Sequence, residues 1–239
     1  MDRTSALSVE RATVTFDGVT AVDDVTFSVP RGVTQAVIGP NGAGKTTLVN
    51  LVCGLEAGTG VIRLGDVAIS GLRPDRRAAA GLARSFQTPI LCPDLGVLDN
   101  IRVGAPRAAA RDAARVRELL DALGIEAPPG APVDTLTHRD RRLVEIARAL
   151  LRGPSVLILD EPAAGLGQAE ADSMMAAVVE TVSATGGTIV IIEHNMDLIS
   201  TWADRVLVLD RGRVLAEGTP REIRADAAVV EAYLGGEWS

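Results

Sequence analysis

The sequence predicts an α/β fold with a mainly parallel sheet at its core, an antiparallel β subdomain and an inserted α-helical subdomain. Residues 156–159 and 188–192 are apolar without alternation, which is typical of parallel strands buried on both faces. Residues 7–16 and 20–29 alternate apolar and polar side chains, which is typical of antiparallel strands. Helical periodicity replaces strand patterns over residues 74–153.

The β subdomain and the first part of the α/β core are assigned to about residues 1–73. The expected strands lie at 7–16, 20–29 and 36–38, the first two joined by a turn at Asp17-Gly18, and a strand-turn-strand is expected at about 60–70. A helix is expected at 45–53, followed by Gly54 as its stop, because glycine tolerates the left-handed conformation at a helix C-terminus.

About residues 74–153 are assigned to the helical subdomain, because Arg and Ala dominate and strand patterns are absent. The helices expected there cover 108–123 and 140–152, separated by a loop at Pro128-Pro129-Gly130 and ended by Gly153-Pro154.

The core is expected to resume over about residues 154–239 and to complete a single domain of 239 residues. The expected elements are strands at 156–159 and 188–192, a helix at 168–184, a short helix leading to Trp202 and a hairpin of 205–209 with 213–217. A capping box with Pro220 at the first helical position predicts a last helix starting at Thr219-Pro220.

The composition is that of a globular protein with an aliphatic core. Hydrophobic residues make up 47%, aromatic residues 3%, and the net charge is −7, which disfavours sequence-independent binding to nucleic acid. Cys53 and Cys92 lack metal-ligand spacing and are expected to be free thiols. No signal peptide and no apolar run long enough to cross a bilayer is found, so a soluble, cytosolic protein is expected.

A glycine-rich segment between the expected strand and the helix at 45–53 fits the phosphate-loop pattern of a P-loop NTPase. Its residues are Gly39, Pro40, Asn41, Gly42, Ala43, Gly44, Lys45 and Thr46, with Thr47 next in the expected ATP-binding set. The glycines let backbone N–H groups surround phosphate oxygens, and the helix N-terminus adds a positive dipole. Lys45, the only lysine in the chain, is expected to reach the β- and γ-phosphates, and Thr46 to coordinate Mg²⁺. The alternative is a chance glycine loop.

Asp160 and Glu161 follow the apolar run at 156–159. The carboxyl end of a buried parallel strand is where nucleotides bind in open α/β sheets. Asp160 is therefore expected to hold Mg²⁺ through water, and Glu161 to polarise the attacking water. The alternative is that the pair caps the next helix.

With these motifs in place, nearly the whole chain resembles the ATP-binding subunits of ABC transporters. The resemblance implies that Gln87, in Arg84-Ser85-Phe86-Gln87, is the Q-loop glutamine that contacts Mg²⁺ and water. It implies that His194 contacts the γ-phosphate, and that Ala164-Gly165-Leu166 passes between two such subunits. It also implies that Phe16 stacks on adenine. The alternatives are a strand-end histidine and a core phenylalanine.

The segment aligned with the family's Leu-Ser-Gly-Gly-Gln signature departs from that pattern. Its residues are Leu136, Thr137, His138, Arg139 and Asp140. In the family, the signature touches the γ-phosphate of ATP held by the opposite subunit. Thr137 keeps a hydroxyl, whereas Arg139 replaces a glycine that permits close approach. Arg139 either hinders closure or itself meets phosphate, and a weakened or altered site is favoured.

Further stretches resemble the ATPases of branched-chain amino acid importers: 161–166, 192–198, 216–220 and the ending Ala232-Tyr233-Leu234-Gly235. The resemblance implies ATP and Mg²⁺ as cofactors, a second ATPase subunit in a homo- or heterodimer, and transmembrane permease subunits. No nucleic acid is expected, and the location expected is the cytoplasmic face of the cell membrane. The function that the resemblance implies is coupling of MgATP binding and hydrolysis to membrane transport, with import of branched-chain amino acids or similar cargo. The alternative is a nucleotide-binding regulatory subunit with weak or no hydrolysis at the site that uses its degenerate signature. The apolar residues expected either to line the permease groove or to belong to the core are Ile90, Leu91, Leu95, Val97 and Leu98.

Overall fold

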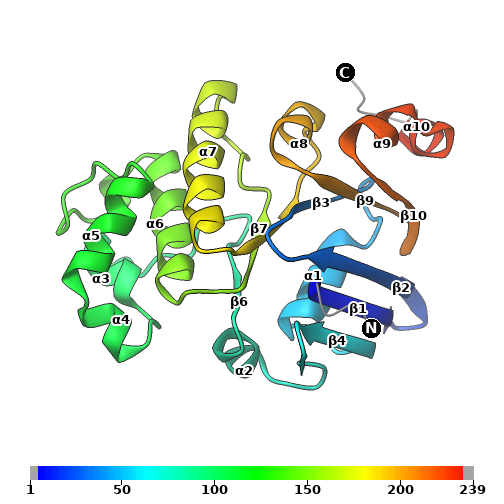
Figure 1. Cartoon of the computed structure of the whole chain (residues 1–239), viewed down its shortest axis with the longest axis horizontal. Coiled ribbons are helices and arrows are strands. Elements are labelled where there is room, and N and C mark those ends of the chain that lie inside the picture. The colour runs from blue at the N-terminus through cyan, green and yellow to red at the C-terminus, as the bar shows by residue number, and fades with distance from the viewer. Residues whose placement is uncertain (1–4, 234–239) are drawn as a thin grey trace.

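Two sheets organise the protein, whose computed structural model describes residues 5–233 (Figure 1). In spatial order, the antiparallel sheet contains β2 (Val19–Pro30), β1 (Ser5–Phe16), β4 (Thr59–Leu64) and β5 (Val67–Ala68). The second sheet contains, in spatial order, β10 (Arg213–Gly218), β9 (Arg205–Asp210), β3 (Thr34–Ile38), β8 (Thr188–Ile192), β7 (Val156–Asp160) and β6 (Leu82–Arg84). Only β10 runs antiparallel to its neighbour in that sheet.

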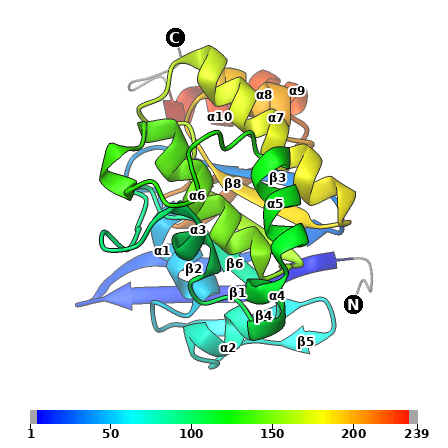
Figure 2. The ribbon, with the colours of Figure 1, turned by 90° about the vertical axis from the view of Figure 1, so that its left-hand side faces the viewer.

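The helices cover both faces of the second sheet. The helix α1 (Lys45–Cys53) packs with the antiparallel sheet against one face. On the other side lie α3 (Val97–Arg102), α4 (Arg107–Arg111), α5 (Ala113–Ala122), a 3₁₀ turn (Val133–Thr135), α6 (His138–Leu151) and α7 (Gln168–Ala184) (Figure 2). The remaining helices are α2 (Pro74–Ala79), α8 (Met196–Trp202), α9 (Pro220–Ala225) and α10 (Ala227–Tyr233).

The strand β7 shows why these apolar runs do not alternate. Val156 and Ile158 belong to the core under the antiparallel sheet, whereas Leu157 and Leu159 belong to the core under α6 and α7. Both faces of β7 are therefore buried, so every position is apolar until the acidic residue at the carboxyl end.

Most elements agree with the sequence prediction, including α1, α7 and β8 at their predicted bounds. The expectation that residues 74–153 contain no strand is wrong, because β6 adds an edge strand to the parallel sheet. The helix expected at 108–123 is two helices, since Asp112 ends α4 and caps α5 through Arg115 N. The last predicted helix is likewise split at Asp226.

Two further predictions concern sulfur chemistry and the membrane. Both cysteines are free thiols, as expected, and burial raises the pKa of Cys53 to about 11. Within residues 5–233, no helix combines the length and apolar character needed to cross a bilayer. Leu234 and Gly235 of the predicted C-terminal motif lie outside the described residues.

Candidate functional site

The phosphate loop lies between β3 and α1, pressed against two neighbouring strands. A Cβ atom on Gly39 would lie 2.2 Å from Leu209 O in β9, and one on Gly44 would lie 2.3 Å from Ala21 O in β2. Gly44 has a φ of 97°, which favours glycine, and no side chain caps the N-terminus of α1. The N–H groups of the first turn therefore remain donors for an anion.

Lys45 bends back over this loop. Its Nζ donates to Gly39 O at 2.6 Å and to Pro40 O at 3.1 Å. Burial lowers the pKa of Lys45, and the nearby carboxylates of Glu161 and Asp160 partly oppose that change. The ammonium group thus lies between the loop carbonyls and the acidic end of β7.

Thr46 and Thr47 occupy the next two positions of α1, and Thr46 is exposed. Asn41 and Gly42 are exposed at the tip of the loop, whereas Ala43 is buried beneath it. The predicted loop residues are therefore contiguous around one helix N-terminus, as the strand–loop–helix context requires.

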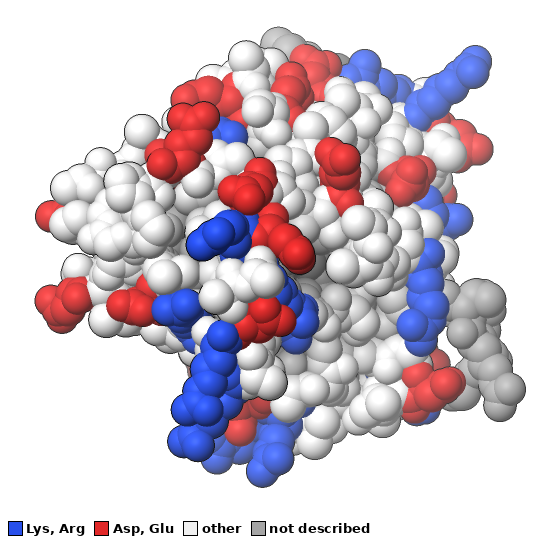
Figure 3. Space-filling view, turned by 60° about the vertical axis from the view of Figure 1, so that its left-hand side comes forward, with Lys and Arg blue, Asp and Glu red and all other residues white. Residues whose placement is uncertain are grey.

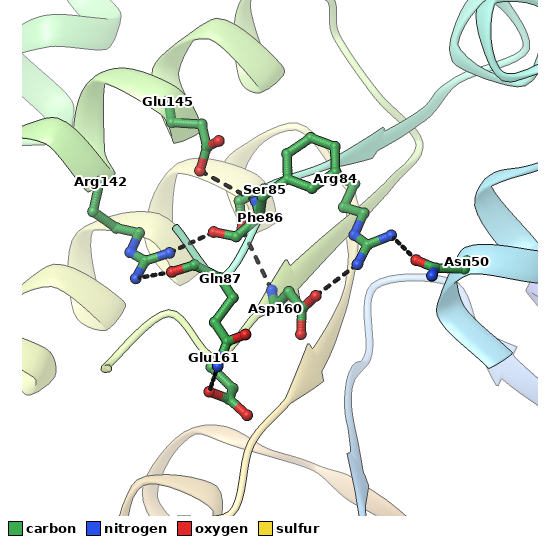
Figure 4. Close-up of polar contacts among 9 residues, drawn as sticks. All are labelled: Asn50, Arg84, Ser85, Phe86, Gln87, Arg142, Glu145, Asp160 and Glu161. Atoms are coloured by element: carbon green, nitrogen blue, oxygen red, sulfur yellow. Dashed lines mark hydrogen bonds and ion pairs between the residues drawn. The ribbon is translucent and has the colours of Figure 1, made fainter. Parts of the chain in front are cut away.

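Asp160 ends β7 and is held by an arginine from the adjacent edge strand (Figure 4). Arg84 Nη2 donates to Asp160 Oδ2 at 2.6 Å, and Arg84 Nη1 donates to Asn50 Oδ1 on α1 at 2.6 Å. The Arg84 and Asp160 side chains are only 8% and 9% exposed, so the pair is almost fully removed from water. The sequence offered no signal for Arg84 in this role.

Glu161, Gln87 and His194 converge beside Asp160. Gln87 Nε2 donates to Glu161 Oε2 at 2.6 Å, and His194 Nδ1 lies 4.0 Å from Glu161 Oε1. Glu161 has a φ of 45°, an uncommon conformation for a side-chain-bearing residue, and its N–H donates to Ile192 O at 2.9 Å. The helix-capping alternative for the acidic pair is wrong, because α7 begins only at Gln168.

Glu193 joins the loops that follow β7 and β8. Its buried carboxylate accepts Ala163 N at 3.2 Å, His194 N at 3.1 Å and Asn195 N at 3.4 Å. Sequence reasoning missed this residue, although an acidic side chain at the end of an apolar strand was the signal that identified Asp160. Glu193 fixes the backbone from which His194 projects.

Two charged residues of α6 fix the segment that carries Gln87. Arg142 donates to Phe86 O at 2.6 Å and to Gln87 O at 2.8 Å. Glu145 accepts Phe86 N at 3.2 Å and Ile90 N at 3.0 Å. Burial is the main influence on both side chains: it lowers the pKa of Arg142 and raises the pKa of Glu145. Opposite charges three positions apart on one helix were a signal that the sequence analysis did not use.

Phe16 lies at the end of β1, 43% exposed, so the core-phenylalanine alternative is wrong. The same hairpin passes beside the phosphate loop through Ala21, which faces Gly44. The Tyr233 side chain in α10 lies near the Gly39 backbone, and burial raises the pKa of Tyr233. The helix α10 therefore lies near the start of the phosphate loop.

The signature segment forms the start of α6. Thr137 is its N-cap: its hydroxyl oxygen accepts Asp140 N at 3.1 Å and donates to Asp140 Oδ2 at 2.8 Å. Arg139 lies 3.6 Å from the same carboxylate, with its guanidinium beside Gly124. Both side chains therefore make their contacts within the helical subdomain.

The other signature side chains also pack within the chain. Leu136 lies against the core under α6, and the His138 ring lies beside Gly165, where a Cβ atom would stand 3.4 Å from it. Gly165 has a φ of 77°. The signature segment is therefore in contact with the predicted intersubunit loop of its own chain.

The apolar residues that follow Gln87 differ in burial. Val97 is fully buried in the core, whereas Ile90 is 58% exposed. Ile90 borders a groove with a volume of about 390 Å³, whose other lining residues include Cys53, Arg84, Phe86, Arg148 and Arg152. Leu91 and Leu98 are partly buried against the helical core.

The strand–loop–helix phosphate cradle, with carboxylates at the end of a parallel strand, defines a P-loop nucleotide-binding protein. The profile of the ABC transporter family matches residues 22–164, and that of the branched-chain amino acid ATP-binding cassette transporter matches residues 213–239. The chain belongs to the ABC transporter family, as one of its ATP-binding, ATP-hydrolysing subunits.

Similarity extends along nearly the whole chain. This chain is 34% identical to the high-affinity branched-chain amino acid transport ATP-binding protein BraF of Pseudomonas aeruginosa. The alignment of 248 residues covers 96% of this chain and 97% of BraF. The corresponding protein LivG of Escherichia coli K12 gives the same identity and coverage. A crystal structure of an ABC-transporter ATP-binding cassette in its ADP conformation superposes with a TM-score of 0.88 at 28% identity, covering 97% of this chain and 99% of the other.

Importers of other cargo also match. The ribose import ATP-binding protein RbsA of Chelativorans is 35% identical, with 90% of this chain and 43% of RbsA covered. The Fe(3+) ions import ATP-binding protein FbpC 2 of Rhodococcus jostii is 36% identical, with 92% of this chain and 64% of that protein covered. Neither the site nor these relatives support a regulatory subunit that does not hydrolyse ATP.

Proposed function

We propose that this chain hydrolyses MgATP to drive an importer of branched-chain amino acids or chemically similar cargo. The observation that carries the ATPase proposal is the convergence of Gln87, Glu161 and His194 beside the phosphate loop. The cargo class is supported by the match at residues 213–239 and by the chain-length similarity to BraF and LivG.

The donor groups present fit ATP and Mg²⁺. Loop N–H groups and Lys45 suit the phosphates, while Thr46, Gln87 and Asp160 offer the oxygen ligands that Mg²⁺ prefers. When bound, Mg²⁺ supplies neutralisation of the charge that develops on the phosphates. Phe16 offers an exposed ring for adenine.

The chain's own residues then position the nucleophile. Gln87 holds one oxygen of Glu161, which leaves the other oxygen, on the His194 side, to accept a proton from the attacking water. The left-handed backbone of Glu161 turns this side chain out of the line of β7. His194 projects from a loop fixed by Glu193 and is suited to contact the γ-phosphate.

A complete site is proposed to need a second subunit, whose signature segment closes over ATP bound to this chain. The groove beside Ile90 is proposed to receive a permease subunit, and the chain is accordingly proposed to act at the cytoplasmic face of the membrane. On the face shown in Figure 3, basic side chains gather along the lower edge, at the height of α2, while acidic and basic side chains are interspersed elsewhere.

The test is steady-state ATP turnover with Mg²⁺, for the full chain alone and with its partner subunits, beside Glu161→Gln. Wild type is expected to turn over, and the variant to bind ATP while losing at least about a hundredfold in rate. Turnover retained by Glu161→Gln contradicts the assigned base. Cargo is tested by uptake of labelled leucine against ribose in vesicles holding the assembled transporter, where leucine uptake is expected.

A further inference from the structure

Arg84 connects the phosphate-loop helix to the acidic end of β7 through a single guanidinium group (Figure 4). One nitrogen donates to Asn50 on α1, and another donates to Asp160 on β7, both at 2.6 Å. The Phe86 ring lies 5.0 Å from the Arg84 Cζ atom and covers this link on the groove side. Arg84 thereby spans the two elements that must present Thr46 and Asp160 to one ion.

The contacts constrain the orientation of the Asp160 carboxylate. Its Oδ2 atom is the acceptor for Arg84, and its backbone N–H donates to Ser85 Oγ at 3.4 Å. Within the described residues, no hydrogen bond is found to Oδ1. The guanidinium is planar and donates in two fixed directions, so it ties the position of Asp160 Oδ2 to that of Asn50 on α1. A lysine ammonium keeps the charge but does not reproduce this fork.

We infer that Arg84 is a positioning residue for the Mg²⁺ site: it holds Asp160 with Oδ1 directed away from the guanidinium and fixes that carboxylate relative to the phosphate-loop helix. The inference rests on the proposed function, in which Asp160 holds the ion. A purely structural ion pair would change the stability of the fold without changing the dependence of nucleotide binding on Mg²⁺.

The experiment measures binding of a fluorescent ATP analogue to the full chain, first in excess EDTA and then across a Mg²⁺ titration. The variants are Arg84→Lys, Asn50→Ala and the double variant. The matched control is Arg76→Lys, an arginine whose side chain is 75% exposed. Arg84→Lys is expected to raise the half-saturating Mg²⁺ concentration about tenfold, while affinity in EDTA stays within about twofold. Asn50→Ala is expected to shift it in the same direction by less.

The double variant tests whether the contacts of Arg84 with Asn50 and with Asp160 act together. If they do, its Mg²⁺ dependence equals that of Arg84→Lys, because both changes break the same link. The inference is overturned if the two changes raise the half-saturating Mg²⁺ concentration by factors that multiply. It is also overturned if Arg84→Lys shifts that concentration no more than Arg76→Lys does. Asn50→Ala removes no charge, so it carries the test if Arg84→Lys fails to fold; an unchanged Mg²⁺ requirement in that variant then overturns it.

Asp160→Asn separates this failure from failure of the proposed function. If nucleotide binding by the wild type is independent of Mg²⁺, or if Asp160→Asn leaves its dependence unchanged, the assignment of the ion site itself is wrong. If Asp160→Asn abolishes the dependence and Arg84→Lys does not alter it, only the positioning role is wrong.

Discussion

At the scale of single residues, three positions around the phosphate loop accept only glycine, because a neighbouring strand lies where a side chain would stand. The nearest backbone oxygen to a Cβ atom would be 2.2 Å away at Gly39, 2.3 Å at Gly44 and 2.8 Å at Gly212. Gly42 also has a positive φ, of 80°, but nothing lies within 4 Å of its Cβ position. The loop is thus held against β2 and β9 by close backbone packing at some glycines and not at others.

This difference predicts unequal effects on stability. Gly42→Ala adds only the left-handed backbone cost and is expected to lower the free energy of unfolding by about 1–2 kcal/mol. Gly44→Ala adds a clash with Ala21 O as well, so a loss of about 3 kcal/mol or more is expected. Urea unfolding of both variants without nucleotide measures the difference. Equal losses would mean that β2 moves away from the loop at little cost.

The sequence identified residues whose chemistry is local and missed those whose partner is distant. Lys45 and Asp160 follow from the order strand, loop, helix and from the end of an apolar strand. Arg84 is one of many arginines, and its partner Asp160 lies 76 positions further along the chain. Only the pairing of β6 with β7 brings them together, and no spacing in the sequence encodes that pairing.

At the scale of elements, the helix α6 fixes the backbone of the segment that carries Gln87. Arg142 donates to two carbonyl groups of that segment, and Glu145 accepts two of its N–H groups. Both the donors and the acceptors of the segment's backbone are therefore bound by α6. Because α6 begins within the signature segment, one helix of 14 residues connects that segment to the backbone of Gln87.

Glu145→Gln is expected to weaken the contacts by which α6 fixes this segment. The amide keeps one acceptor oxygen but places its NH₂ group against the N–H of Phe86 or Ile90, leaving a buried donor unpaired. A loss of about 1–3 kcal/mol in the free energy of unfolding is expected, with a fall in ATP turnover because Gln87 loses its support. Chemical denaturation and turnover measure the two effects.

Burial raises the pKa of Glu145 above its ordinary 4.5, so its charged form costs the folded protein more than the unfolded chain. Wild type should therefore gain stability relative to Glu145→Gln as the pH falls from neutrality towards 4.5. A stability difference that is independent of pH would contradict the assigned burial effect.

The predicted element boundaries are wrong where tertiary contacts outweigh the local pattern of apolar and polar residues. β6 has three residues, too few for periodicity to show, and it exists because β7 offers an open edge. The break between α4 and α5 arises because the Asp112 side chain accepts Arg115 N and caps a new helix inside a periodic run.

At the scale of the whole molecule, the two halves of a proposed ATP site lie on different parts of the chain. The phosphate loop belongs to the α/β core, whereas the signature segment starts α6 in the helical subdomain. The contacts of Thr137 and Arg139 stay within that subdomain. A signature that serves ATP on a second subunit suits this arrangement, and ATP turnover per chain should then rise with chain concentration.

Arg139 replaces a glycine of the family's signature, at the point where a second subunit is proposed to approach. It is held by Asp140 at 3.6 Å and by packing beside Gly124, so it adds fixed bulk at the start of α6. Arg139→Ala removes that bulk without the helix cost of glycine. The chain concentration for half-maximal turnover is expected to fall at least about fivefold, the equivalent of roughly 1 kcal/mol. Arg139→Lys, which keeps length and charge, should show little change. A fall in turnover with alanine would instead mean that the guanidinium binds phosphate on the opposite subunit.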